Sequence, residues 1–152
     1  MFVQHDTMWP YAGQPGAEPS GPQRRDDPAG LTPIQRDLLW CVRRLAMVRP
    51  LGSARDAHVH ALLQRRFGEH GLGLEHLLRC LILGLAQRAV RPLRLHLPFH
   101  ACVAADEQRL LLALAEASRP ARAAAALAPM AGSRGAELVP YLAGIAALLP
   151  PE

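Results

Sequence analysis

The chain contains no lysine and no asparagine, and only 5% of its 152 residues are aromatic. All 17 basic residues are therefore arginine. Isoleucine, phenylalanine and tyrosine are also scarce, whereas alanine, glycine and proline are abundant. We attribute this bias to a GC-rich genome rather than to selection for phosphate recognition. The composition, half of it hydrophobic, excludes a wholly disordered chain and a collagen.

Cysteines are also few, and the apolar runs are short. Cys41, Cys80 and Cys102 form neither a CxxC pair nor an even-numbered disulfide framework, which favours reduced thiols. Residues 1–10 lack the basic and apolar regions of a secretory signal. The longest apolar run, residues 77–86, is about half the length of a membrane span. We therefore expect a cytoplasmic protein without a membrane partner.

Residues 1–30 are rich in proline and glycine and show no helical or strand periodicity, which predicts a disordered tail. The tail contains two arginines and four acidic residues, so its net charge is −2. Residues 31–152 therefore carry a net charge of +6. These residues are expected to form a single helical domain. The tail also contains Trp9 and Tyr11. They are interpreted as a motif that docks on a partner, as part of a tail that folds back onto its own domain, or as chance.

The domain is predicted to begin with a helix at Thr32-Pro33-Ile34-Gln35, which combines an N-cap, a proline in the first turn and a capping-box glutamine. Other helices are expected over residues 54–67 with Ser53 as N-cap, and over 74–85, 105–117, 120–128 and from about 137 onward. Leu93, Leu95 and Leu97 indicate an extended, partly buried connector. The fold class predicted is all-α, a compact bundle or orthogonal array of five to six helices.

Several short segments are similar to a known family: residues 38–46 (LLWCVRRLA), Phe67-Gly68, residues 77–79 (LLR) and residues 105–107 (ADE). Their order over residues 32–118 resembles a family of small helical proteins of GC-rich proteobacteria with no assigned function. Members of that family carry a paired cysteine and a Thr-Asp-Glu step, where this chain has Ala101-Cys102 and Ala105-Asp106. The resemblance implies a helical fold and a taxonomic setting, and no activity.

A structural metal site is one hypothesis for the histidines and cysteines. His76 and Cys80 are four residues apart on one predicted helix face, and His100 and Cys102 lie on the connector. Two cysteines and two histidines suit tetrahedral Zn²⁺, although no standard ligand spacing is present. The alternative is that Cys80 is a small half-buried apolar residue and His100 a turn residue.

The sequence predicts no enzyme. Phosphate-binding glycine loops, GxSxG and HExxH are absent from it. Asp106 and Glu107 are interpreted as acids that stabilise the positive end of a helix dipole. His100 and Cys102 would point apart on an extended connector, which disfavours a nucleophile and base pair.

Nucleic-acid binding is an alternative function. Residues 54–89 resemble a helix-turn-helix pair. The connection between the two helices, residues 68–73, is longer than is usual for this motif. The second helix is also too apolar to present many side chains to bases. The arginines around this pair are Arg65, Arg66, Arg79, Arg88, Arg91 and Arg94.

The leading hypothesis is a non-enzymatic interaction or regulatory module that binds a protein partner or itself. Trp40, Arg36, Arg43 and Arg44 are predicted to lie away from the buried face of the first helix. Tryptophan and arginine are enriched at interface hot spots. Trp40 alternatively packs beneath the tail or a neighbouring helix. The candidate interaction residues are Trp40, Arg36, Arg43, Arg44, Trp9 and Tyr11.

Overall fold

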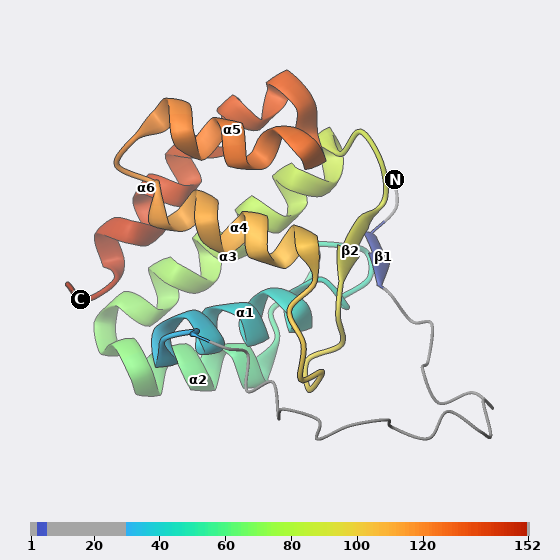
Figure 1. The fold of residues 1–152 in the computed structure, drawn as a ribbon. Coiled ribbons are helices and arrows are strands. Elements are labelled where there is room, and N and C mark those ends of the chain that lie inside the picture. Colours follow the sequence, from blue (N-terminus) through green and yellow to red (C-terminus); the bar gives the residue numbers. More distant parts are fainter. Residues whose placement is uncertain (1–2, 6–29, 152) are drawn as a thin grey trace, which may run out of the picture.

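The computed structural model describes residues 3–5 and 30–151. The predicted all-α class is confirmed over this part of the chain, in which no helix is long and apolar enough to cross a membrane. The α-helices are α1 (Pro33–Leu45), α2 (Ala57–Phe67), α3 (Gly71–Arg88), α4 (Ala105–Ala115), α5 (Pro120–Ala131) and α6 (Val139–Leu148), and the 3-10 segments are η1 (Gly68–His70) and η2 (Gly132–Leu138) (Figure 1).

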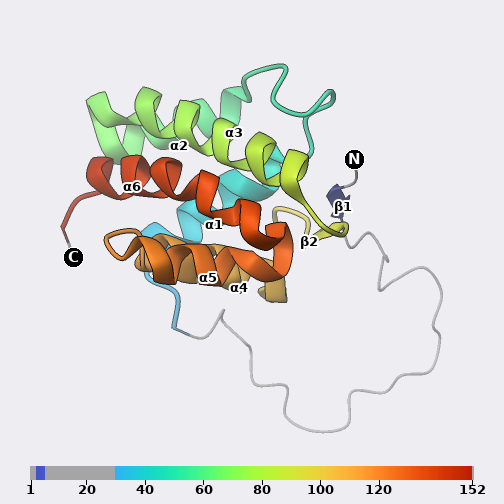
Figure 2. The ribbon, with the colours of Figure 1, turned by 90° about the horizontal axis from the view of Figure 1, so that it is seen from above.

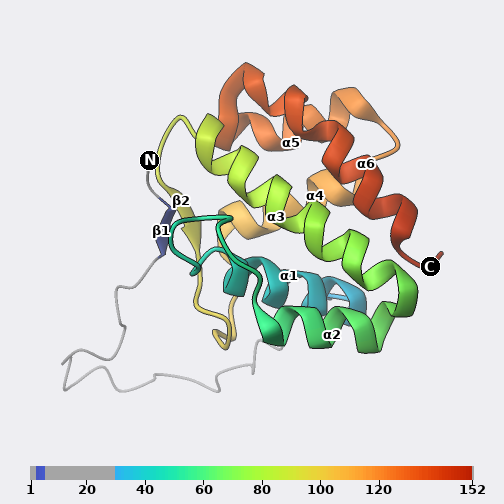
Figure 3. The same ribbon diagram turned by 180° about the vertical axis from the view of Figure 1, so that it is seen from behind.

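Helix α3 lies at the centre of the array, where it contacts α1, α2, α5 and α6. Seen from behind, α3 runs diagonally across the molecule beside α6, and α2 packs near its N-terminal end (Figure 3). Helices α4 and α5 pack against each other on the far side of α6 from α3 (Figure 2). Helix α1 lies between α2 and α4, so its two sides face different neighbours.

Helix α1 begins as the sequence predicts. The Gln35 N–H donates to Thr32 Oγ1 at 3.2 Å, and the Thr32 N–H donates to Gln35 Oε1 at 3.0 Å, which completes the capping box. The predicted core positions Leu38, Cys41, Val42 and Leu45 are all buried, whereas Ile34 is half-buried at the edge of the core.

The predicted start of the second helix is wrong. Helix α2 begins at Ala57, and its N-cap is Asp56 rather than Ser53. Asp56 Oδ1 accepts from the N–H groups of His58 (2.8 Å) and Val59 (3.1 Å), and Asp56 Oδ2 pairs with Arg44 of α1. This ion pair to a neighbouring helix adds a tertiary contact that the local sequence does not reveal.

Helix α3 begins earlier than predicted, at Gly71, so only η1 separates it from α2. A Cβ atom on Gly71 would lie 2.7 Å from the Leu63 carbonyl oxygen. Glycine therefore allows the start of α3 to approach the backbone of α2 closely. Gly68, with φ +55°, ends α2 as predicted.

The predicted end of the helix that starts at residue 120 is also wrong, because α5 continues beyond residue 128, through Pro129, to Ala131. Pro129 is exposed and lies in the last turn of the helix, where the carbonyl group that loses its partner belongs to the exposed Ala125. The last helix begins at Val139 with Pro140 in its first turn, close to the predicted start.

The connector between α3 and α4 contains strand β2 (Leu93–Leu95), whose residues are alternately buried, exposed and buried, as the period of two predicts. Strand β1 (Val3–His5) pairs with β2 in parallel, Val3 opposite Leu93. No strand was predicted in residues 1–30. Residues 6–29 of the predicted tail, with Trp9 and Tyr11, lie outside the described part of the chain.

Candidate interaction surface

One predicted surface residue, Arg43, is buried instead, with 4% of its surface exposed. Its Nε and Nη2 atoms donate to the two carboxylate oxygens of Glu107 at 2.8 Å each. Nη1 and Nη2 also donate to the carbonyl groups of His100 (2.9 Å) and Cys102 (2.7 Å). The expectation that Arg43 faces solvent is therefore wrong, because the connector and the start of α4 cover this side of α1.

The adjacent acids of α4 are both buried and fully partnered. Glu107 accepts from Arg43 and from the N–H groups of His96 and Ala104, each at 2.8 Å. Asp106 accepts two bonds from Arg91, at 2.7 and 2.8 Å, and one from the Arg94 N–H. Burial raises the pKa of Asp106, but the Arg91 and Arg94 bonds lower it by more, so the pKa stays below its ordinary value. These carboxylates hold the connector against α4.

Trp40 remains on the surface side of α1, half-buried between two open grooves. Its ring lies 5.3 Å from the Arg44 guanidinium, which also pairs with Asp56. The larger groove, about 470 Å³, runs between α1 and α2, and we call it the Trp40 groove. Its lining includes Arg36, Asp37, Trp40, His58, Leu62 and Arg65. The smaller groove, about 170 Å³, separates α1 from the connector.

The arginines of the described residues are nearly all paired within the molecule. Most donate to a carboxylate or a backbone carbonyl, whereas the side chains of Arg36, Arg65 and Arg94 have no such partner in the part of the chain described. Two of these three line the Trp40 groove. The acid of the groove, Asp37, is paired with Arg66. Within residues 3–5 and 30–151, nothing compensates these two positive charges, which lie beside a half-buried tryptophan.

Most of the arginines predicted to surround a helix-turn-helix pair already donate to another residue of this domain. Arg66, Arg79, Arg88 and Arg91 pair with Asp37, the Gly52 carbonyl, Glu137 and Asp106 respectively. The linker η1 has three residues, shorter than predicted and within the usual range. The supposed recognition helix, however, is the central helix α3, and the free arginines Arg65 and Arg94 lie outside it.

The four proposed metal ligands are not brought together. His76 Nε2 lies 3.7 Å from Cys80 Sγ on α3, whereas the Cys102 N–H donates to His100 Nδ1 at 3.1 Å within the connector. Arg43 holds the connector against α1 through the His100 and Cys102 carbonyl groups. Among residues 3–5 and 30–151 no group of three or more His, Cys, Asp or Glu side chains is placed to hold a metal ion.

The sequence identifies Trp40, Arg36 and Arg44 as candidate interaction residues, but it does not identify α2 as the other side of the groove. His58, Ala61, Leu62 and Arg65 of α2 recur at i, i+3, i+4 and i+7, which marks a single helix face. That spacing was available in the sequence. Which helix it faces depends on the tertiary structure.

No protein-family model, curated protein or solved structure matches this chain. A function for the chain is therefore argued from the chemistry of its surface.

Proposed function

We propose that residues 31–152 act as one non-enzymatic domain, an array of five to six helices, that binds a protein partner through the Trp40 groove. The observation that carries this proposal is the coincidence of Trp40 with Arg36 and Arg65, two arginines without a partner in the described part of the chain. Desolvated tryptophan and arginine side chains dominate the binding energy of many interfaces.

The arrangement of the groove indicates what a partner presents. Arg66 pairs with Asp37, and Arg44 pairs with Asp56, so the C-terminal end of α2 lies beside the N-terminal end of α1. Arg36 and Arg65 consequently lie at one end of the groove. Trp40 and Leu62 form its apolar floor. A partner segment with an apolar side chain and a nearby carboxylate complements both parts.

A different protein is favoured over a second copy of this chain. In a two-fold dimer the same patch is used by both subunits. Both subunits would then bring Arg36 and Arg65 to the interface, while the acid of the groove, Asp37, is already paired with Arg66. Adding like charges to an interface without a free carboxylate is unfavourable. Self-association through the Trp40 groove therefore lacks the complementarity that an acidic partner provides.

The proposal is tested by affinity capture from an extract of the native host with matched variants. Arg36→Glu/Arg65→Glu reverses the charge of the groove, and Arg119→Glu/Arg122→Glu makes the same change in net charge at the N-cap and first turn of α5. We expect one protein to be captured by the native chain and by the α5 variant. It should be depleted at least about tenfold by the groove variant and by Trp40→Ala. Equal recovery by all four chains contradicts the proposal.

Two further arms separate the alternatives. Trp9→Ala/Tyr11→Ala should leave capture unchanged, because the proposal assigns docking to the Trp40 groove. If this variant alone loses the partner, docking belongs to residues 1–30 instead. Retention of random duplex DNA at about 50 mM salt, lost by about 200 mM salt and unaffected by Trp40→Ala, would replace the proposal with nucleic-acid binding through charge.

A further inference from the structure

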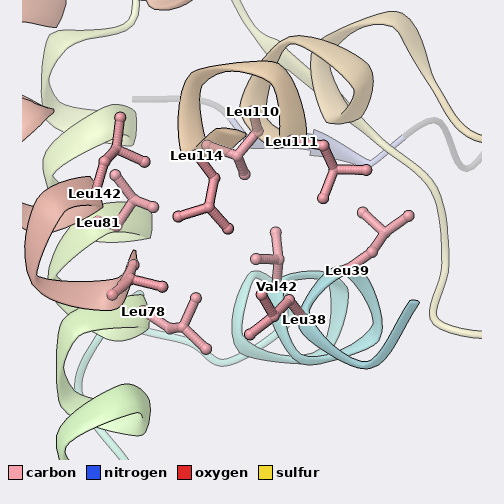
Figure 4. A pocket seen from close by; sticks show the side chains of 10 residues that line it. Leu38, Leu39, Val42, Leu78, Leu81, Leu110, Leu111, Leu114 and Leu142 are labelled. Atoms are coloured by element: carbon pink, nitrogen blue, oxygen red, sulfur yellow. The ribbon is translucent and has the colours of Figure 1, made fainter. Parts of the chain in front are cut away.

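A small apolar cavity lies between α1, α3, α4 and α6, on the opposite side of α1 from α2. Its volume is about 20 Å³, and all ten residues that line it are leucine, isoleucine or valine. Figure 4 shows Leu110, Leu111 and Leu114 of α4 directed toward α1, where Leu38, Leu39 and Val42 face them. The interior of this cavity offers no hydrogen-bonding side chain.

An open groove at the surface adjoins the cavity. Its volume is about 200 Å³, and Leu38, Leu111 and Leu114 line both spaces, so the two lie side by side between α1 and α4. We call the groove and the adjoining cavity the α1–α4 slot. Small side chains, including the exposed Ala115 and Ala146, stand at its mouth.

Of the described residues that line the mouth, one is polar and none is charged. Gln35 lines it, and the Oε1 atom of Gln35 accepts from the Thr32 N–H at 3.0 Å. Its Nε2 group donates to no acceptor in the described part of the chain, so an amide N–H remains for a ligand. The absence of a lining arginine distinguishes this slot from the Trp40 groove and disfavours a charged ligand.

We propose that the α1–α4 slot binds a single uncharged acyl chain of medium length, with its apolar end against Leu38, Leu111 and Leu114 and its carbonyl oxygen at Gln35. An engineered apolar cavity of about 150 Å³ binds benzene, so the groove of about 200 Å³ has room for about eight carbon atoms. A second copy of the chain is a poor occupant. The groove is formed by nine residues, whereas a stable interface needs roughly 20 to 30 residues on each side.

The probe for this proposal is octanamide, titrated into the full chain with ¹³C-labelled leucine methyl groups observed by NMR. We expect saturable shifts of the Leu38, Leu111 and Leu114 methyl signals. Each methylene group buried strengthens binding about fourfold, so butanamide should bind at least about 100-fold more weakly. Octanoate should also bind more weakly than octanamide, because none of the described residues at the mouth carries a positive charge that would neutralise a carboxylate.

Matched variants on α6 locate the site. Ala146→Leu narrows the mouth, whereas Ala143→Leu changes an equally exposed residue of the same helix that does not line the slot. The first should weaken octanamide binding at least about tenfold and the second should leave it unchanged. Ala115→Leu provides an independent mouth variant on α4 if Ala146→Leu alters the circular dichroism spectrum.

Three results would overturn the proposal: no saturable shifts with octanamide, equal binding by the mouth and control variants, or a concentration-dependent dimer that the mouth variant abolishes. The last result would assign the groove to a second copy. Trp40→Ala should leave octanamide binding intact, so this test is independent of the proposed docking function.

Discussion

Arg43 on α1 and Glu107 at the start of α4 form a buried, two-bonded ion pair between residues 64 apart in the sequence. Their side chains are 5% and 0% exposed. Burying two charges is costly unless the remaining donors and acceptors are also bonded. Here the connector supplies these partners, because its carbonyl groups accept from Arg43 and its N–H groups donate to Glu107. The ion pair therefore joins α1, α4 and the connector.

Loss of either partner of this pair should be strongly destabilising. Arg43→Met leaves the Glu107 carboxylate buried without its cation, and we expect a loss of about 3–5 kcal/mol in the free energy of unfolding measured in urea. The double variant Arg43→Met/Glu107→Leu should lose less than Arg43→Met alone. Arg119→Met changes an exposed side chain at the N-cap of α5, serves as the control and should change stability by less than about 0.5 kcal/mol. A cost below about 1 kcal/mol for Arg43→Met would contradict the assigned role.

Acid should unfold the protein in part through two buried carboxylates. Hydrogen bonding from Arg55 lowers the pKa of Glu75 against the opposing effect of burial. The pKa of Asp106 is also lowered, because its bonds to Arg91 and Arg94 outweigh burial. The folded state therefore binds fewer protons than the unfolded state. This stability is present above the ordinary values of 4.5 and 3.8, and it is lost as pH falls through the lower folded values.

The measurement is the urea midpoint between pH 7 and pH 3. Glu75→Gln and Asp106→Asn should each lower stability at pH 7 and flatten its decline below about pH 4.5. Glu69→Gln removes an exposed carboxylate and should reproduce the native decline. If the stability of both Glu75→Gln and Asp106→Asn falls with pH as steeply as that of the native protein, these two carboxylates do not drive acid unfolding.

The close approach of α2 and α3 predicts a specific cost at Gly71. A methyl group there meets backbone atoms of Leu63 and Gln64 at 2.7–2.8 Å, and we expect Gly71→Ala to cost about 1–3 kcal/mol. Gly73→Ala is the matched control two residues further on, where the added Cβ meets only the Leu148 Cδ1 atom at 2.9 Å. A methyl group at the end of a side chain can move, so this variant should cost less. A larger cost for Gly73→Ala would contradict the backbone contact.

The three cysteines should differ in reactivity. Cys41 is buried in the core, and burial raises the pKa of its thiol to about 12. Almost no thiolate is therefore present at pH 8. Cys102 is exposed and should react first with a disulfide reagent in the native protein. Cys102→Ser should remove the fast phase, whereas Cys41→Ser should change only the number of thiols found after unfolding. A Cys41 thiol that reacts in the folded protein would contradict its burial.

Local patterns in the sequence were sufficient for much of the fold. The Thr32 capping box, the buried face of α1 and the end of α2 at Gly68 all depend on residues within one or two turns. Ser53 is a suitable N-cap by residue type, but so is Asp56, which caps α2 in the structure. The ion pair of Asp56 with Arg44 is a tertiary contact that the local pattern does not contain.

Only the α1 side of the Trp40 groove could be predicted from the sequence. Trp40 and Arg36 lie on one face of α1, which the helical period identifies. Arg43 is placed by the same period among surface residues, and only a carboxylate 64 residues away reverses that expectation. The approach of Arg65 to Trp40 depends on how α2 packs against α1. The pairing of β1 with β2 is likewise a contact between distant segments.

The hydrogen bonds of the connector have a consequence for local opening. The N–H groups of Arg94, His96 and Ala104 donate to carboxylate oxygens of α4. In a helix or sheet, backbone hydrogen bonds protect the amides from hydrogen exchange. Here protection depends on the Asp106 and Glu107 carboxylates, which must be packed in place and ionised. These three amides should exchange as one unit, ahead of the helix interiors. We therefore expect residues 94–104 to open as one cooperative unit, which the side chains of Asp106, Glu107 and Arg43 join to the helical array.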